Sequence, residues 1–208
     1  MQFLHVVGVR SVFALGFFAL LRPKELFQLT KACLKLPIGP LLGGSRVAVA
    51  SILDPKNRAF MGRLQVRIIR DSACIDWLLW YASCLPPSAL LWPFSEHSFR
   101  TCLTACCEFY DVAHLKLTPA SLRAGGATLM LEQGYPLSTI KFAGSWASDK
   151  AMSCYLQEAE SASVMLSLNR SQLHRLEKAL LEFRILEHPP QVPFAIVSHG
   201  SRARSKVV

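Results

Sequence analysis

The stretch from Thr118 to Gln157 limits what this chain can fold into more than any other part of it. The stretch reads TPASLRAGGATLMLEQGYPLSTIKFAGSWASDKAMSCYLQ. Thr118 followed by proline is typical of a helix N-terminus, and Gly134 is placed to end that helix. Gly144 begins a turn, and Ser148 is positioned to cap another helix behind it. The sequence therefore predicts several consecutive helices here, one of them starting near residue 138.

Two adjacent glycines, Gly125 and Gly126, lie inside the first of these helices. Each costs about 1 kcal/mol of helix propensity relative to alanine, so a helix tolerates the pair where another backbone or a ligand must come close. Arg123 lies one turn into the same helix, near its electropositive end. Trp146 and Tyr155 follow in the same stretch, and we predict that these three side chains act together.

The composition predicts one domain, or one domain and a tail. Of the 208 residues 51% are apolar, enough for a sizeable core, and the formal net charge is +9. This charge favours polyanions or anionic surfaces as partners. The seven cysteines contain no CxxC pair and suit a reducing compartment. The histidines show no ligand spacing, so we expect neither a metal site nor a cofactor.

The N-terminal apolar segment, residues 3–21, is predicted to be a buried core helix. Arg10 interrupts it, and the remaining run of apolar residues is too short to span a bilayer. We therefore expect no membrane partner. Pro23 then suits the first turn of a second helix, which places Arg22 at a helix junction beside free backbone amides. Arg22 could hold an anion there, or cap the preceding helix or pair with Glu25.

Two β-favouring segments, residues 46–53 and 64–70, flank the turn signal Asp54-Pro55-Lys56-Asn57. They predict a β-hairpin with Lys56 at or near its tip. A lysine on a hairpin loop is usually only solvated, so the pattern alone assigns it no function. Helices are predicted again at residues 71–84 and 95–110.

The fold class predicted from these elements is α+β, mostly helical, with a small β-hairpin or sheet. The predicted division is a main domain at 1–158, an amphipathic C-terminal helix at 159–188, and a basic, disordered tail at 189–208. The amphipathic helix could pack on its own domain or dock on a neighbouring protomer.

Four fragments in this order resemble the catalytic domain of the tyrosine recombinase (phage integrase) family. They are LLRPKEL around Arg22, SLRAGGAT around Arg123, AGSWAS around Trp146 and CYLQ around Tyr155. The hairpin between the first two fragments and the interval from Trp146 to Tyr155 also match the family. The resemblance covers residues 4–156, and the SLRAGGAT form is similar to eukaryotic, mobile-element-like members.

The resemblance implies site-specific cleavage and rejoining of double-stranded DNA without a metal, as in DNA integration and recombination. Arg22 and Arg123 would neutralise the scissile phosphate. Tyr155 would attack phosphorus and form a 3′-phosphotyrosine. Lys56 would protonate the leaving 5′-oxygen, and Trp146 would donate its indole N–H to a phosphate oxygen. A homo-oligomer on DNA, joined through the C-terminal helix, and an intracellular location, nuclear if the source is eukaryotic, follow from the same resemblance.

The sequence departs from the family at Ala120, where the family usually has a histidine. Loss of such acid–base help typically lowers a rate on the order of 10²–10⁴-fold; Ser121 and His114 are the candidates to replace it. The family's N-terminal clamping domain is also expected to be absent. The alternative functions are a catalytically inactive DNA-binding or interaction module on the same fold, and a membrane-surface protein using residues 3–21. A type IB topoisomerase shares the chemistry, but the LRAGGAT pattern favours a recombinase.

Overall fold

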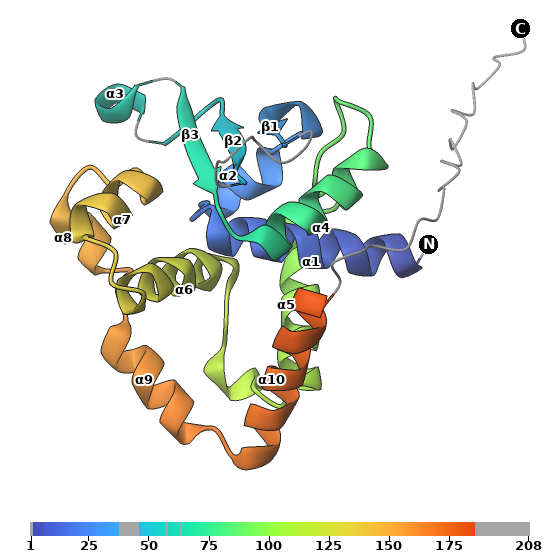
Figure 1. Cartoon of the computed structure of the whole chain (residues 1–208), viewed down its shortest axis with the longest axis vertical. Helices are drawn as coiled ribbons and strands as arrows, with labels where there is room; N and C mark the ends of the chain where they lie inside the picture. The colour runs from blue at the N-terminus through green and yellow to red at the C-terminus, as the bar shows by residue number, and fades with distance from the viewer. Residues whose placement is uncertain (1, 38–45, 57, 63, 186–208) are drawn as a thin grey trace, which may run out of the picture.

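The computed structural model describes residues 2–37, 46–56, 58–62 and 64–185 (Figure 1). These parts are mostly helical and include a small antiparallel sheet, which confirms the predicted α+β class. The elements in chain order are α1 (Gln2–Phe18), α2 (Pro23–Gln28), the 3₁₀ turn η1 (Lys31–Cys33), β1 (Leu34–Lys35), β2 (Ala48–Ile52), α3 (Arg58–Met61), β3 (Gln65–Ile69), α4 (Ser72–Ser83), α5 (Glu96–Phe109), the 3₁₀ turn η2 (Ala113–Leu115), α6 (Pro119–Glu132), α7 (Leu137–Gly144), α8 (Asp149–Ser153), α9 (Glu158–Ser167) and α10 (Arg170–Ile185).

Helix α1 forms the centre of the fold, because it packs against both α4 and α6. Val12 and Leu15 on α1 are completely buried, as the apolar run predicts. Trp92 and Phe99 extend this core, with their rings 5.2 Å apart. No helix in the described part of the chain is both long and apolar enough to cross a membrane.

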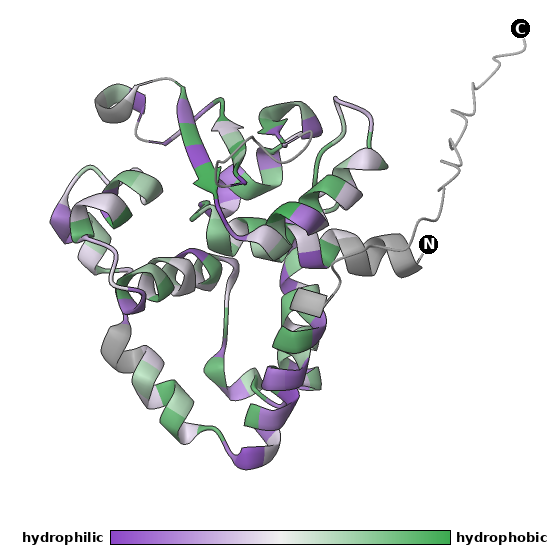
Figure 2. Ribbon diagram, viewed as in Figure 1, coloured by the Kyte–Doolittle hydropathy of each residue, from purple (hydrophilic) through white to green (hydrophobic). Residues whose placement is uncertain are grey.

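The predicted hairpin is confirmed: β2 and β3 pair antiparallel, with Ala50 opposite Arg67. The short strand β1, which the sequence did not predict, pairs with the other edge of β2, so the sheet order is β1-β2-β3. Figure 2 shows hydrophilic and hydrophobic residues alternating along β3. Its buried face carries Gln65, Arg67 and Ile69, and its apolar neighbours Val66 and Ile68 are on the exposed face.

Helix α6 begins and ends as predicted. Thr118 and Ser121 form a capping box at its start, and Gly134 follows its end with φ 79°. The glycine pair lies where α6 crosses α1. A Cβ atom at Gly126 would stand 2.0 Å from the backbone oxygen of Phe17, closer than any real contact. The prediction that another backbone comes close at this pair is therefore confirmed.

The C-terminal amphipathic segment, predicted as one helix over 159–188, consists of two helices within the described residues. α9 and α10 are separated at Leu168, where Asn169 starts α10 by exchanging hydrogen bonds with Gln172 at 2.8 and 3.0 Å. Helix α10 packs on its own domain, because Phe183 stacks on Trp77 with ring centres 6.1 Å apart. Residues 186–188 and the predicted tail at 189–208 lie outside the described residues.

Candidate functional site

Arg123 lies at the centre of the candidate site and is only 1% exposed. Its Nη1 atom donates to the backbone oxygen of Leu20 at 2.5 Å, and Nη2 donates to that of Gly144 at 2.8 Å. These two carbonyls come from the turn that follows α1 and from the end of α7. The guanidinium therefore joins three parts of the chain that are far apart in sequence.

Two aromatic rings cover this guanidinium. The ring centre of Trp146 lies 4.1 Å from the Arg123 Cζ atom, and that of Tyr155 lies 5.2 Å from it. The two rings are themselves 5.3 Å apart and tilted by 52°. Ring faces attract a cation, and the attraction is stronger in a dry site. The structure thus brings together three of the residues that the sequence predicts to act together.

The turn after α7 positions Trp146. Ser145 adopts a left-handed conformation with φ 51°, and the Trp146 amide donates to the backbone oxygen of Lys141 at 3.0 Å. Gly144 lies against the indole: a Cβ atom there would stand 1.9 Å from the ring. Only glycine therefore allows Trp146 to lie back over the end of α7.

Tyr155 follows helix α8 and is not part of it, which corrects the expectation of a helix carrying the tyrosine. Ser148 caps α8 as predicted, accepting a hydrogen bond from the Ala151 amide at 3.1 Å, but the helix already ends at Ser153. The Tyr155 segment is held against α6 instead, because the Thr128 hydroxyl donates to the Tyr155 carbonyl at 3.4 Å. Tyr155 is half-buried there.

Arg22 is the N-cap residue of α2 and pairs with Glu25. Its Nη1 atom donates to one Glu25 carboxylate oxygen at 2.6 Å, and its backbone amide donates to the other at 3.0 Å. The pairing anticipated as an alternative is thus present, and anion binding by Arg22 stays a prediction. One fifth of the Arg22 side chain is exposed, so it is the more accessible arginine of the site.

Arg67 is a further arginine in this region, which sequence reasoning missed. Its side chain is fully buried on the inward face of β3, donates to the Ser145 hydroxyl, and lies 3.6 Å from the Glu25 carboxylate. The alternation in residues 64–70 gives the period of the strand but not its inward face. The available signal was an arginine in the middle of a predicted strand. If that side chain is buried, its charge needs a partner such as the Glu25 carboxylate.

The charges at the site are unbalanced, because three arginines surround one carboxylate, that of Glu25. Burial, and next to it the positive charge of Arg22, lower the pKa of Arg123 to about 9, while Glu25 acts in the opposite direction. Burial also lowers the pKa of Arg67, and Glu25 opposes that change. An additional negative charge at this position would therefore be stabilised.

Four donors at the site lack a hydrogen-bond partner among the described residues. They are the Nε atom of Arg123, the indole Nε1 atom of Trp146, and the Nε and Nη2 atoms of Arg67, all buried. Buried donors are nearly always paired in native structures, and a ligand with acceptor oxygens would satisfy them. None of these nitrogens reaches solvent in this conformation, so such a ligand would enter only after side chains at the site move.

The other residues named in the sequence analysis take no part in the hydrogen bonds and ring contacts described for this cluster. Lys56 is exposed on the β2–β3 connection, and within the described ranges no hydrogen bond or ion pair links it to the cluster. Ala120 and His114 are both exposed. The Ser121 hydroxyl accepts a hydrogen bond from the Thr118 amide at 3.0 Å, so it serves the helix cap.

The described residues contain no group of three or more histidine, cysteine, aspartate or glutamate side chains placed to hold a metal ion. Comparisons of the chain with protein family models, curated proteins and solved structures found no match. The resemblance to tyrosine recombinases therefore rests on the motifs quoted above and stays a prediction.

Proposed function

We propose that this chain cleaves and rejoins double-stranded DNA, with Tyr155 as nucleophile. The observation that carries the proposal is the Arg123 guanidinium, buried over the rings of Trp146 and Tyr155, in a site whose buried donors include Arg123 Nε and Trp146 Nε1 without a hydrogen-bond partner in the described structure. A phosphodiester supplies the missing negative charge and the acceptor oxygens. The positive net charge of the chain, +9, favours the same partner.

In the proposed reaction the Tyr155 oxygen attacks phosphorus and gives up its proton to solvent water. A phosphorus–oxygen bond forms to Tyr155, and the bond to the 5′-oxygen breaks, leaving a 3′-phosphotyrosine. Lys56 supplies the proton that the 5′-oxygen needs, which requires the hairpin connection to close on bound DNA. Arg22 and Arg123 neutralise the phosphate, and rejoining reverses the same steps.

A second candidate function is DNA binding without cleavage on the same fold. Three observations favour it: Ala120 provides no acid–base group, Arg22 is paired with Glu25, and Lys56 lies outside the cluster. This version keeps the positive net charge of the chain, +9, and loses the chemistry. It predicts salt-sensitive DNA binding that is unchanged by Tyr155→Phe.

We further propose that the protein forms a homo-oligomer on DNA through its C-terminal helices. Helix α10 packs on its own domain, yet Leu180 and Leu181 are 51% and 58% exposed, and Leu166 on α9 is 88% exposed. These side chains provide an apolar surface for a neighbouring protomer. Light scattering with and without a DNA duplex tests this, and a protein that remains a monomer on DNA would exclude it.

The experiment that separates the two candidate functions uses a pool of nicked duplexes with randomised sequence around the nick. Cleavage beside the nick releases a short fragment, so the covalent product accumulates. A detergent-resistant protein–DNA product that disappears in Tyr155→Phe supports strand cleavage. Retained DNA binding without any such product supports the binding module, and absence of DNA binding rejects both.

A further inference from the structure

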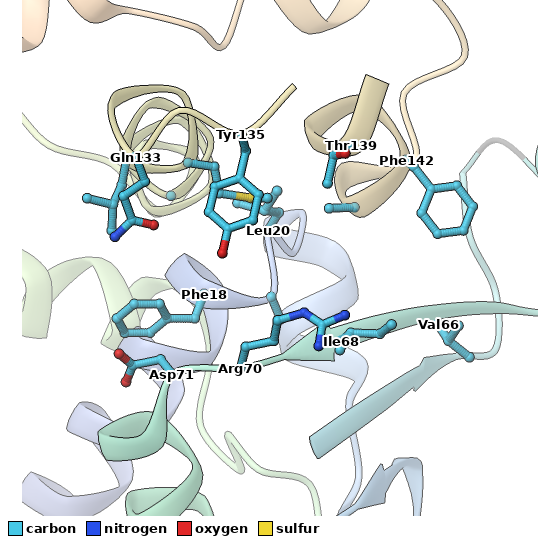
Figure 3. A pocket seen from close by; sticks show the side chains of 15 residues that line it. Phe18, Leu20, Val66, Ile68, Arg70, Asp71, Gln133, Tyr135, Thr139 and Phe142 are labelled. Carbon is cyan, nitrogen blue, oxygen red and sulfur yellow. The ribbon is translucent and has the colours of Figure 1, made fainter. Parts of the chain in front are cut away.

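A groove of about 380 Å³ lies between the outward face of β3 and helices α6 and α7 (Figure 3). Val66 and Ile68 line it from β3, Leu129 and Met130 from α6, and Phe142 from α7. Its lining contains none of the residues proposed to cleave DNA. Its use therefore does not depend on the proposed chemistry, although Leu20, whose backbone oxygen accepts a hydrogen bond from Arg123, also lines it.

Two elements expose apolar side chains to this groove for different reasons. On β3, the burial of Arg67 beside Glu25 fixes which face is inward, and strict alternation then turns Val66 and Ile68 outward, 48% and 45% exposed. Helix α7 has no strand alternation that would turn a side chain outward, and its Phe142 is nevertheless 73% exposed. Exposed apolar residues that gather from independent elements mark an interaction site.

One end of the groove holds the guanidinium of Arg70, with the carboxylate of Asp71 next to it. Arg70, which directly follows β3, is exposed and forms no ion pair with any described residue. The neighbouring carboxylate of Asp71 is engaged elsewhere, because it accepts the Cys74 amide at 2.7 Å and caps α4. Figure 3 shows Arg70 at the β3 side of the groove and the Tyr135 hydroxyl pointing into it from the opposite side.

We propose that the groove binds a short apolar segment of a partner protein that carries a carboxylate beside Arg70. The apolar side chains of the segment cover Val66, Ile68 and Phe142, and its carboxylate pairs with the Arg70 guanidinium. The apolar face of β3 extends beyond the groove to Leu64, which is 65% exposed. From Leu64 to Arg70 the strand runs roughly 20 Å, a length that suits a peptide rather than a small acid.

The test uses the full chain, fluorescently labelled, on an array of hexapeptides in which glutamate precedes alternating apolar residues and serines. A matched array carries glutamine in place of the glutamate. We expect saturable binding to members of the glutamate array and weaker binding to their glutamine counterparts. Arg70→Gln should weaken the affinity for the glutamate peptides about tenfold and leave the affinity for the glutamine peptides unchanged. Ile68→Ser should weaken the affinity for the peptides of both arrays about fivefold.

Lys178→Gln removes one exposed positive charge on α10, away from the groove, and serves as the matched control. It should bind like the wild type, and thermal unfolding shows whether each variant is folded. The proposal is overturned if neither array binds, or if Arg70→Gln and Ile68→Ser bind like the control. It is also overturned if octanoate displaces the peptides and binds more tightly than they do, since a small acid would then be the occupant. Binding to phosphatidylglycerol vesicles alone would overturn it as well, since a membrane would then be the occupant.

Discussion

The guanidinium of Arg123 lies 4.1 Å from the ring centre of Trp146, and both side chains are at least 97% buried. A buried cation on an indole face contributes about 2 kcal/mol or more, whereas an exposed one contributes about 0.5–1 kcal/mol. The relationship therefore supports the fold as well as the proposed phosphate site. It also requires Gly144, because a side chain there would displace the indole.

Trp146→Phe should lower the free energy of unfolding by about 1–2 kcal/mol, because a ring remains under Arg123 but attracts the cation less. Trp146→Ala should cost about 3–5 kcal/mol, because it leaves a cavity under the guanidinium. Urea denaturation measures both values. Equal losses for the two variants would contradict this, because the phenyl ring that remains in Trp146→Phe would then neither fill the space under Arg123 nor attract its charge.

Gly126→Ala should destabilise the protein by about 1–3 kcal/mol, because its Cβ atom would meet the rigid backbone oxygen of Phe17 at 2.0 Å. Gly125→Ala is the matched comparison. Its Cβ atom meets the Phe17 ring at 2.9 Å, which can shift, and alanine gains about 1 kcal/mol of helix propensity. Gly125→Ala should thus be the milder change in thermal unfolding, and the opposite order would contradict the described crossing of α1 and α6.

Glu25→Gln should destabilise the fold by about 3–5 kcal/mol, because it leaves the buried Arg67 without its carboxylate. Adding Arg67→Met to this variant should restore part of the loss, because a buried charge is then removed. A double-mutant cycle with urea denaturation gives the coupling between the two residues. Additive losses would mean that Glu25 and Arg67 do not act as a pair.

The pKa of Arg123 predicts a pH dependence. In the folded state it is lowered to about 9 from the ordinary 12.5, so between these values the unfolded state binds more protons and stability rises with pH. Relative to that of Arg123→Met, the free energy of unfolding of the wild type should rise by on the order of 1 kcal/mol between about pH 8 and pH 10. Urea denaturation of both proteins across this range measures the difference. A constant difference would show that Arg123 stays charged throughout.

Local signals in the sequence predicted much of the fold. Thr118 and Gly134 define α6, Ser148 caps α8, and the turn signal near Lys56 joins two paired strands. Each of these elements is specified by residues close together in the chain. The site, in contrast, was predicted only as a set of candidate residues, because sequence order does not show which side chains meet.

The features that the sequence analysis missed have different causes, and long-range packing accounts for the position of Arg67. The inward position of Arg67 is decided by Glu25 and Ser145, which come from α2 and the end of α7. The division of the C-terminal segment had a local signal that was missed, namely the capping pair Asn169 and Gln172. We recognise no local sequence signal for the end of α8 before Tyr155.

The measurement that tests the central claim most directly is mass-spectrometric mapping of the residue linked to DNA. The chain has four tyrosines, at positions 81, 110, 135 and 155. After incubation with the nicked duplex pool and nuclease digestion, the account predicts one nucleotide-linked peptide, containing Tyr155. Tyr135→Phe should leave this product intact. A linkage at any other residue, or no linkage in a protein that binds the duplexes, would contradict strand cleavage by Tyr155.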